Sequence, residues 1–186
     1  EHKLRFGCDD LFALNKEAYF RAVDIAAPKD IVFRWLCQMK AAPYSYDRLD
    51  NGGRKSPQKI NPELLKLSIG DKMMTIFSVV DFKLNSEITL LMDVPPGKYK
   101  SLYVPTAITY KLLGGRDKNP FHTRLVVKYV AQWQNNFHDK LERLAVIFAD
   151  FIMMRKQLLN FKKLSERDYN KIHGVIYHGQ KRTQVN

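Results

Sequence analysis

A stretch of thirty residues in the last third of the chain, Asn135 to Leu164, contains no glycine and no proline. At 1.5 Å per residue it is long enough for a helix of about 45 Å. On a 100° wheel one face holds Leu141, Leu144, Ala145, Phe148, Phe151, Ile152 and Leu159, widened by Ile147, Met154, Leu158 and Phe161. A face this broad needs a broad apolar partner. The sequence therefore predicts one long helix that packs against a large surface.

A strand and two short helices are predicted in the first third of the chain. Residues Tyr19 to Ile25 alternate between two faces with the two-residue period of a strand, and Arg21 falls on the inward face. Pro28 fits a first helical turn, where its missing N–H costs nothing, so we expect a helix over Lys29 to Met39. Asn61, followed by a proline and a glutamate, is a typical N-cap for a second helix, which is short.

Four more strand-like runs follow, separated by turn-forming residues. They are Met73–Phe82, Ser86–Asp93, Pro105–Leu113 and Thr123–Ala131, with Lys98–Val104 as a further candidate. Alternation places on the inward face Ile88, Leu90, Met92, Ile108, Tyr110, Leu112, Leu125, Val127 and Tyr129. Arg124 and Lys128 are then expected to face water. A one-sided antiparallel sheet must be covered, and the long helix is the element able to cover it, which predicts an α+β fold.

Length and composition indicate a single globular domain. The chain has 186 residues, of which 45% are hydrophobic and 12% aromatic, enough for a sizeable core without disulfides or metals. We expect an N-terminal arm or short helix in residues 1–18, the domain itself in residues 19–166, and a basic tail in residues 167–186.

The charge favours anionic partners. There are 31 Lys and Arg against 19 Asp and Glu, giving a formal net charge of +12. Residues 151–186 carry eight basic and two acidic side chains, or +6, which a solvated helix end and tail would also explain. Aromatic residues do not interleave with the basic ones, so we expect weak attraction to an acidic membrane surface and no specific nucleic acid.

Other classes of protein are disfavoured. The longest uncharged runs have ten residues, short of the roughly 20 that a spanning helix needs. No signal peptide is visible, although the chain begins at Glu1 and an upstream segment could have been removed. Cys8 and Cys37 show no CxxC spacing, which favours a cytoplasmic location. His122, His138, His173 and His178 lack metal-ligand spacing, and no nucleotide or acyl-transfer motif is present, so neither metal nor cofactor is expected.

One loop concentrates polar chemistry. Tyr44-Ser45-Tyr46-Asp47, with Asp50 and Arg54, offers phenols, a hydroxyl, two carboxylates and a guanidinium within eleven positions. Such groups could orient a polar ligand end or move a proton. Alternatively, Asp47 and Asp50 could cap backbone N–H groups or pair with nearby arginines to hold the loop.

Arg155 interrupts the apolar stripe of the predicted long helix. Burying it unpaired would be costly, so it must meet a carboxylate, solvent at a cavity mouth, or an anionic ligand head. Arg21, on the inward face of its predicted strand, would need such a partner as well. The methionines at positions 73, 74, 92, 153 and 154 could line an adaptable pocket or belong to the core.

The segment Ala26 to Ser56 carries a family resemblance. Together with the strand end just before it, Val23 to Ile25, this segment resembles the START-related helix-grip superfamily of polyketide cyclase-like and lipid-transport-like proteins. The residues that carry the resemblance are that strand end, the Ala27-Pro28 turn, the helix with Phe33, Trp35 and Leu36, and the Tyr44–Asp47 loop. The resemblance covers about Tyr19 to Glu166. It implies a curved antiparallel sheet of six to seven strands wrapped around a long C-terminal helix, with a cavity between them and the polar loop near its mouth.

This resemblance leads to one main functional hypothesis and two alternatives. The main one is binding or transport of a small hydrophobic or amphipathic molecule, with ligand contacts expected from Tyr44, Tyr46, Arg54, Met92, Tyr110, Tyr129, Phe148, Ile152 and Arg155. The first alternative is a cyclase- or dehydrase-like enzyme, for which Asp47 is a weak catalytic candidate. The second is a basic surface that binds acidic membrane or nucleic acid.

Overall fold

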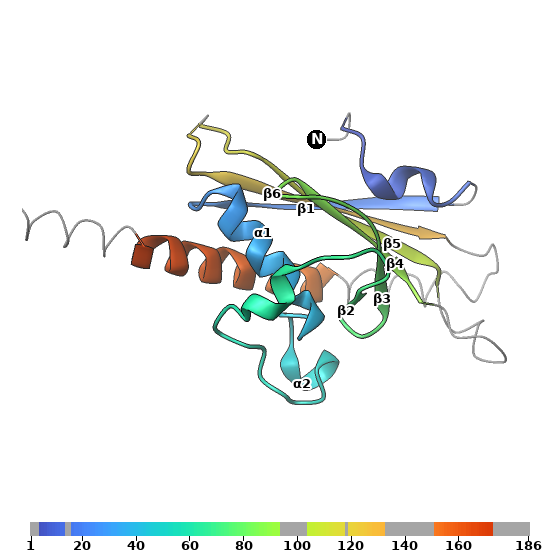
Figure 1. Ribbon diagram of the computed structural model, residues 1–186. Helices are drawn as coiled ribbons and strands as arrows, with labels where there is room; N and C mark the ends of the chain where they lie inside the picture. The colour runs from blue at the N-terminus through green and yellow to red at the C-terminus, as the bar shows by residue number, and fades with distance from the viewer. Residues whose placement is uncertain (1–3, 14–15, 94–103, 118, 133–150, 173–186) are drawn as a thin grey trace, which may run out of the picture.

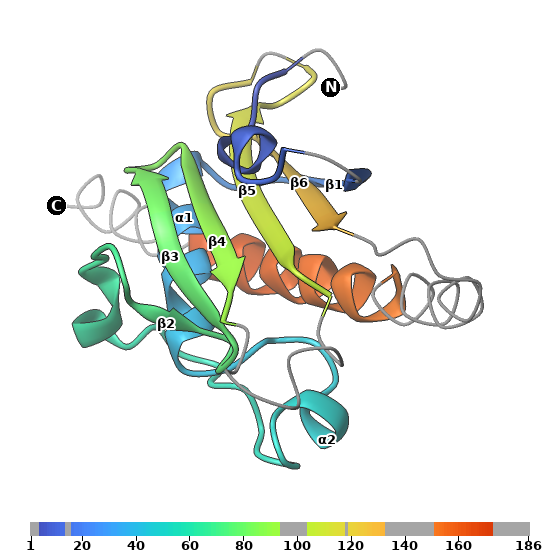
Figure 2. The same cartoon turned by 90° about the vertical axis from the view of Figure 1, so that its right-hand side faces the viewer.

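A six-stranded antiparallel sheet and a helix lying across one of its faces form the centre of the molecule (Figure 1). The computed structural model describes residues 4–13, 16–93, 104–117, 119–132 and 151–172. The sheet order is β1-β6-β5-β4-β3-β2. Its strands are β1 (Lys16–Ile25), β2 (Lys72–Met73), β3 (Phe77–Lys83), β4 (Glu87–Met92), β5 (Thr106–Gly114) and β6 (Thr123–Gln132). The C-terminal helix occupies residues 151–172 and crosses behind β3, β4 and β5 in Figure 2.

Short helices connect the first and second strands. They are α1 (Lys29–Cys37), the 3-10 turns Gln38–Lys40 and Pro62–Leu65, and α2 (Asp47–Asp50). The helix predicted over Lys29 to Met39 is confirmed. The second predicted helix is a single 3-10 turn, and Asn61 caps it by accepting from the backbone N–H of Glu63 at 3.0 Å. In both views α2 stands on a loop apart from the sheet.

The strands follow the predicted order, with one correction. The run Met73–Phe82 is not one strand, because residues 74–76 form a turn that separates β2 from β3. Met74 and Thr75 both have positive φ there, and the Met74 N–H donates to the Met39 carbonyl at 2.9 Å. A tertiary hydrogen bond thus stabilises a turn that lacks glycine. Of the candidate strand Lys98–Val104, only Val104 lies among the described residues, and it is not in a strand.

The C-terminal helix differs from its prediction in extent and in orientation. It continues past Leu164 to residue 172, and residues 135–150 lie outside the described part of the chain. Met154, Leu158 and Phe161 are buried, whereas Phe151, Ile152 and Leu159 are each more than a third exposed. The helix therefore turns toward the sheet the side that the prediction treated as peripheral, and this buried side also includes the polar Gln157. Among the described residues, no helix is long and apolar enough to cross a membrane.

The main core lies between the inner face of the sheet and the helices. The alternation predicted for the strands is confirmed: Ile88, Leu90, Ile108, Tyr110, Leu112, Leu125 and Val127 are buried there. Met92 and Tyr129 pack against this core and remain partly exposed. The inner face is thus apolar except near its centre, where Tyr110 brings a hydroxyl.

A second, smaller core covers the outer face of the sheet. It contains Phe6 and Cys8 from the N-terminal segment, whose 3-10 turn spans Gly7–Asp10, together with Ala107, Val126 and Val130. The prediction that Arg124 and Lys128 face water was wrong, because their side chains are only 12% and 13% exposed. Lys128 pairs with Asp9 and its ammonium lies 5.1 Å from the Phe20 ring centroid, so its aliphatic stem belongs to this outer cover.

Candidate functional site

A cavity of about 430 Å³ lies between the inner face of the sheet and the C-terminal helix. Strands β3 to β6 form one wall, the helix forms another, and the loop that carries α2 borders it. Its lining residues are Pro43, Ser45, Asp50, Met74, Ile76, Phe77, Met92, Ile108, Tyr110, Tyr129, Met153, Met154 and Gln157. Most of these side chains are apolar, and four are methionines.

The methionines come from three different elements. Met74 lies in the turn between β2 and β3, Met92 at the end of β4, and Met153 and Met154 on the C-terminal helix. Unbranched, polarizable thioether side chains adjust to ligands of different shape. Met73, by contrast, is fully buried and belongs to the core. The cavity wall is therefore apolar and deformable.

Gln157 links three parts of the site. Its Oε1 accepts from the Tyr110 hydroxyl at 2.7 Å, and its Nε2 donates to the Pro43 carbonyl at 2.6 Å. The same nitrogen lies 3.1 Å from the Met74 Sδ. Gln157 is 3% exposed, so these bonds are shielded from water. It fixes the beginning of the α2 loop and the C-terminal helix relative to β5.

Asp50 brings a carboxyl group to the cavity. It is half-buried at the end of α2, one oxygen accepts from the Ser45 hydroxyl, and Oδ1 is buried without a hydrogen-bond partner. Burial raises the pKa of Asp50, and the nearby negative charge of Asp47 acts in the same direction. The site therefore holds a carboxyl group that keeps its proton more readily than an ordinary aspartate.

Asp47, the predicted catalytic candidate, holds the loop. Its two oxygens accept from the backbone N–H and the hydroxyl of Ser56, at 2.9 and 2.6 Å. It does not line the cavity. The alternative in which this carboxylate caps a backbone N–H is therefore what the structure shows.

Tyr44 lies in the core beside the cavity. It is 1% exposed and packs between the rings of Trp35 and Phe161, with centroid distances of 6.0 and 5.5 Å. Its backbone has φ of 58°, and its carbonyl accepts from Asn160 Nδ2 at 2.7 Å. The hydroxyl is buried without a partner, and burial raises the pKa of Tyr44. Its position indicates a packing role.

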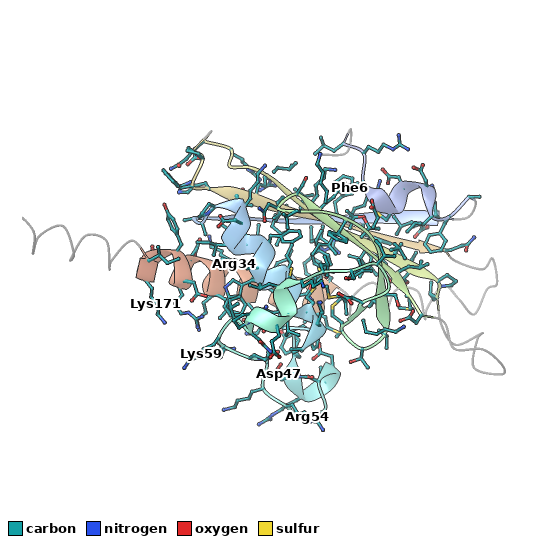
Figure 3. All side chains as sticks on the ribbon, viewed as in Figure 1. Phe6, Arg34, Asp47, Arg54, Lys59 and Lys171 are labelled. Atoms are coloured by element: carbon teal, nitrogen blue, oxygen red, sulfur yellow. The ribbon has the colours of Figure 1, made fainter. Side chains whose placement is uncertain are left out.

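The remaining predicted contacts divide into two groups. Met92, Tyr110 and Tyr129 line the cavity together. Tyr46 and Arg54 are exposed, and Figure 3 shows Arg54 at the outer end of the α2 loop, pointing away from the sheet. The exposed face of the C-terminal helix carries Ile152 and Arg155, and Phe148 lies outside the described residues. The three strand residues predicted as ligand contacts thus lie together at the cavity, whereas the two predicted arginines, Arg54 and Arg155, are exposed and do not line it.

Arg21 faces inward, as its strand position predicts. Its guanidinium lies 4.8 Å from the Phe151 ring centroid and donates to the Phe20 carbonyl at 2.7 Å. The Nε of Arg21 is buried without a hydrogen-bond partner. The partners of the Arg21 guanidinium are therefore an aromatic ring and a backbone carbonyl, where a carboxylate was one of the expected partners.

Sequence reasoning missed Gln157 and gave Asp50 no role of its own in the site. A glutamine three positions after Met154 on a helix carries no local signal, because a polar residue on a helix is usually solvated. Asp50 stood in the polar loop beside Asp47, and only the fold distinguishes the two carboxylates. In the part of the chain that the structure describes, no group of three His, Cys, Asp or Glu side chains is placed to hold a metal ion.

Comparisons with known proteins identify structural relatives only. No family model and no curated protein matches the sequence. Among solved structures, the di-domain ARO/CYC StfQ from the steffimycin biosynthetic pathway has a TM-score of 0.50 at 12% identity, over 82% of this chain and 51% of StfQ. The di-domain ARO/CYC BexL from the BE-7585A pathway has a TM-score of 0.49 at 14% identity, over 82% of this chain and 50% of BexL.

A third solved structure, norcoclaurine synthase from Thalictrum flavum, has a TM-score of 0.45 at 14% identity, over 80% of this chain and 86% of that one. The chain thus spans about half the length of each di-domain protein. At these identities the likeness to StfQ bears on architecture alone. Together with the sheet order and the long C-terminal helix, it shows that this chain has the helix-grip fold.

Proposed function

We propose that the protein binds or transports a small hydrophobic or amphipathic molecule in the cavity between the sheet and the C-terminal helix. The observation that carries this proposal is the cavity of about 430 Å³ with a mainly apolar wall. Protein interiors are otherwise packed as densely as organic crystals, and ligand sites commonly have volumes of about 300–1,000 Å³. A few polar groups on an apolar wall are the usual means of orienting such a ligand.

The likeness to StfQ supports the proposal at the level of the fold. StfQ is a di-domain ARO/CYC from a biosynthetic pathway. One fold can host unrelated functions, so the argument for ligand binding comes from the side chains of this cavity.

A pair of matched variants tests the proposal. The purified protein would be examined by native mass spectrometry, and any bound molecule would be extracted into organic solvent and identified. Met153→Trp places a large ring at the cavity wall, whereas Leu159→Trp places one on the exposed face of the same helix. We expect the wild type and Leu159→Trp to retain ligand and Met153→Trp to lose it. Equal occupancy in all three proteins would count against the cavity as the binding site.

A second candidate is a cyclase- or dehydrase-like enzyme, and one observation favours it. Asp50 brings to the cavity a carboxyl group whose pKa is raised by burial. Such a group could exchange a proton with a bound carbonyl compound. Turnover lost in Asp50→Asn, with binding of a neutral compound retained, would favour this candidate over simple binding.

A further inference from the structure

A second hollow, here called the α1 groove, lies between α1 and the end of the C-terminal helix. Its volume is about 260 Å³, and no described residue lines both this groove and the cavity. The apolar part of its wall comes from Ile31, Trp35, Ile60 and Ile172. Ile31 and Trp35 are 6% and 0% exposed and form a recessed floor, whereas Ile172 is 48% exposed at the edge.

Hydrogen bonds within the protein hold the walls of the α1 groove in place. Gln38, which is fully buried, accepts from the Asn61 N–H at 2.9 Å and donates to the Asn61 carbonyl at 3.3 Å, so the neighbouring Ile60 is held against α1. The Trp35 indole N–H donates to Asp168 at 3.1 Å, which joins α1 to the C-terminal helix. A groove that is already formed loses less conformational entropy when a partner binds.

Two exposed cations, Arg34 and Lys171, also line the α1 groove. None of the ion pairs between described residues includes either of them, although Asp30 lies four positions before Arg34 on α1. Asp168 lines the groove too, but its Oδ1 accepts from the Arg167 guanidinium at 2.7 and 2.9 Å, so its charge is already paired. The groove therefore combines an apolar floor with a positively charged edge.

The surroundings of the α1 groove add positive charge. Lys59 is exposed, and Figure 3 shows it in the same part of the molecule as Arg34 and Lys171. Residues 173–186, which follow the C-terminal helix in the chain, contain two cations and no Asp or Glu, so their side chains offer the groove no carboxylate. A second copy of the chain carries the same net charge of +12. Charge complementarity therefore favours an acidic partner that is a different protein.

The size and depth of the α1 groove indicate what part of such a partner enters it. Small-molecule sites commonly have volumes of about 300–1,000 Å³, and this groove is smaller. A flat membrane surface would meet the cations at the edge and leave the recessed Trp35 uncovered. A peptide can place one large apolar side chain on the floor while its carboxylates reach the edge, which is how amphipathic segments dock into grooves.

We propose that the α1 groove docks an acidic segment of a partner protein, with one leucine or aromatic side chain on the floor and carboxylates on Arg34 and Lys171. This interaction surface goes beyond ligand binding in the cavity and does not depend on it. The net charge of +12 should also speed the encounter with an acidic partner.

Two peptides test the contribution of the apolar floor. The first is labelled with fluorescein and has glutamates on both sides of a central Leu-Phe pair; the second has Ser-Ser at the centre and keeps every charge. Fluorescence anisotropy at about 150 mM salt would measure their binding. We expect the Leu-Phe peptide to bind at least about tenfold more tightly. In Trp133→Phe, Trp35 is the one remaining tryptophan, and its fluorescence should change when this peptide binds.

Two double variants test the contribution of the charged edge. Arg34→Glu with Lys171→Glu reverses the cations of the groove, and Lys156→Glu with Lys163→Glu reverses two cations elsewhere on the C-terminal helix. All four side chains are exposed, and both double variants lower the net charge by the same amount. We expect the groove variant to bind the Leu-Phe peptide at least about tenfold more weakly than wild type and the control to stay within about threefold.

Equal binding of the two peptides, equal weakening by the two double variants, or no binding of the Leu-Phe peptide would overturn the proposal. Vesicles of phosphatidylcholine and phosphatidylserine that bind the wild type and not the groove variant, with the peptide unbound, would assign the groove to a membrane instead. Self-association lost in the groove variant would assign it to a second copy. Met153→Trp alters the cavity and should bind the Leu-Phe peptide like wild type, so this test is separate from that of the proposed function.

Discussion

Replacing Gln157 by leucine should destabilise the protein strongly although the two side chains have similar size. Gln157 is 3% exposed, and the substitution removes the acceptor of the Tyr110 hydroxyl and the donor to the Pro43 carbonyl. A buried group that loses its partner costs about 1–3 kcal/mol, so two such groups cost about 2–6 kcal/mol. That is a large part of the roughly 5–15 kcal/mol by which a domain of this kind is stable.

The free energy of unfolding would be measured by urea titration with intrinsic fluorescence as the signal. Tyr110→Phe in the Gln157→Leu background should recover about 1 kcal/mol or more, because it removes the hydroxyl that has lost Gln157 as its acceptor. Gln58→Leu, on an exposed side chain, serves as the control and should stay within about 0.5 kcal/mol of wild type. A cost below about 1 kcal/mol for Gln157→Leu, or no recovery in the double variant, would refute the reasoning.

Three further predictions follow from the described contacts. Tyr44→Phe should be neutral or stabilising by up to about 1 kcal/mol, since its buried hydroxyl has no partner; a clear loss of stability in urea would contradict this. Gly7→Ala should cost about 1–3 kcal/mol, because an added Cβ would collide with the Thr89 side chain, and an unchanged melting temperature would show that the N-terminal segment yields freely. Burial raises the pKa of Asp50 in the folded protein, so folding favours its protonated form. The stability that this group contributes is fully present below the ordinary aspartate pKa and is lost as pH rises through the raised value. Asp50→Asn should therefore match wild type in melting temperature near pH 3 and exceed it at neutral pH, and a constant difference across that range would exclude this cause.

Much of the fold could be predicted because its signals are local. Strand alternation placed Ile88, Leu90, Ile108 and Tyr110 on the inner face, and that placement is confirmed. The turn at residues 74–76 could not be found in this way, because it has no glycine or proline and depends on a hydrogen bond to the Met39 carbonyl. The orientation of the C-terminal helix was missed for a related reason: a wheel drawn over thirty residues averages the whole stretch, whereas residues 151–172 pack along Met154, Leu158 and Phe161.

The site was predictable only where it lies on strands. Met92, Tyr110 and Tyr129 follow from parity along β4, β5 and β6, and the cavity lies over them. Asp50 lines the cavity and Asp47 does not because of how the α2 loop folds back: Ser56 donates to both carboxylate oxygens of Asp47. No pattern in the sequence reports that arrangement.

The outer cover of the sheet has a consequence for folding during synthesis. The Cys8 N–H donates to Thr109 Oγ1 across 101 positions, and Asp9 binds Lys128 across 119. At about 5–20 residues per second, the ribosome produces these partners roughly 5–20 s after the N-terminal segment emerges. Through that interval Phe6 and Cys8 have no sheet to cover and are available to chaperones. A label fused ahead of this segment would therefore act on this docking step, on the face of the sheet opposite the cavity.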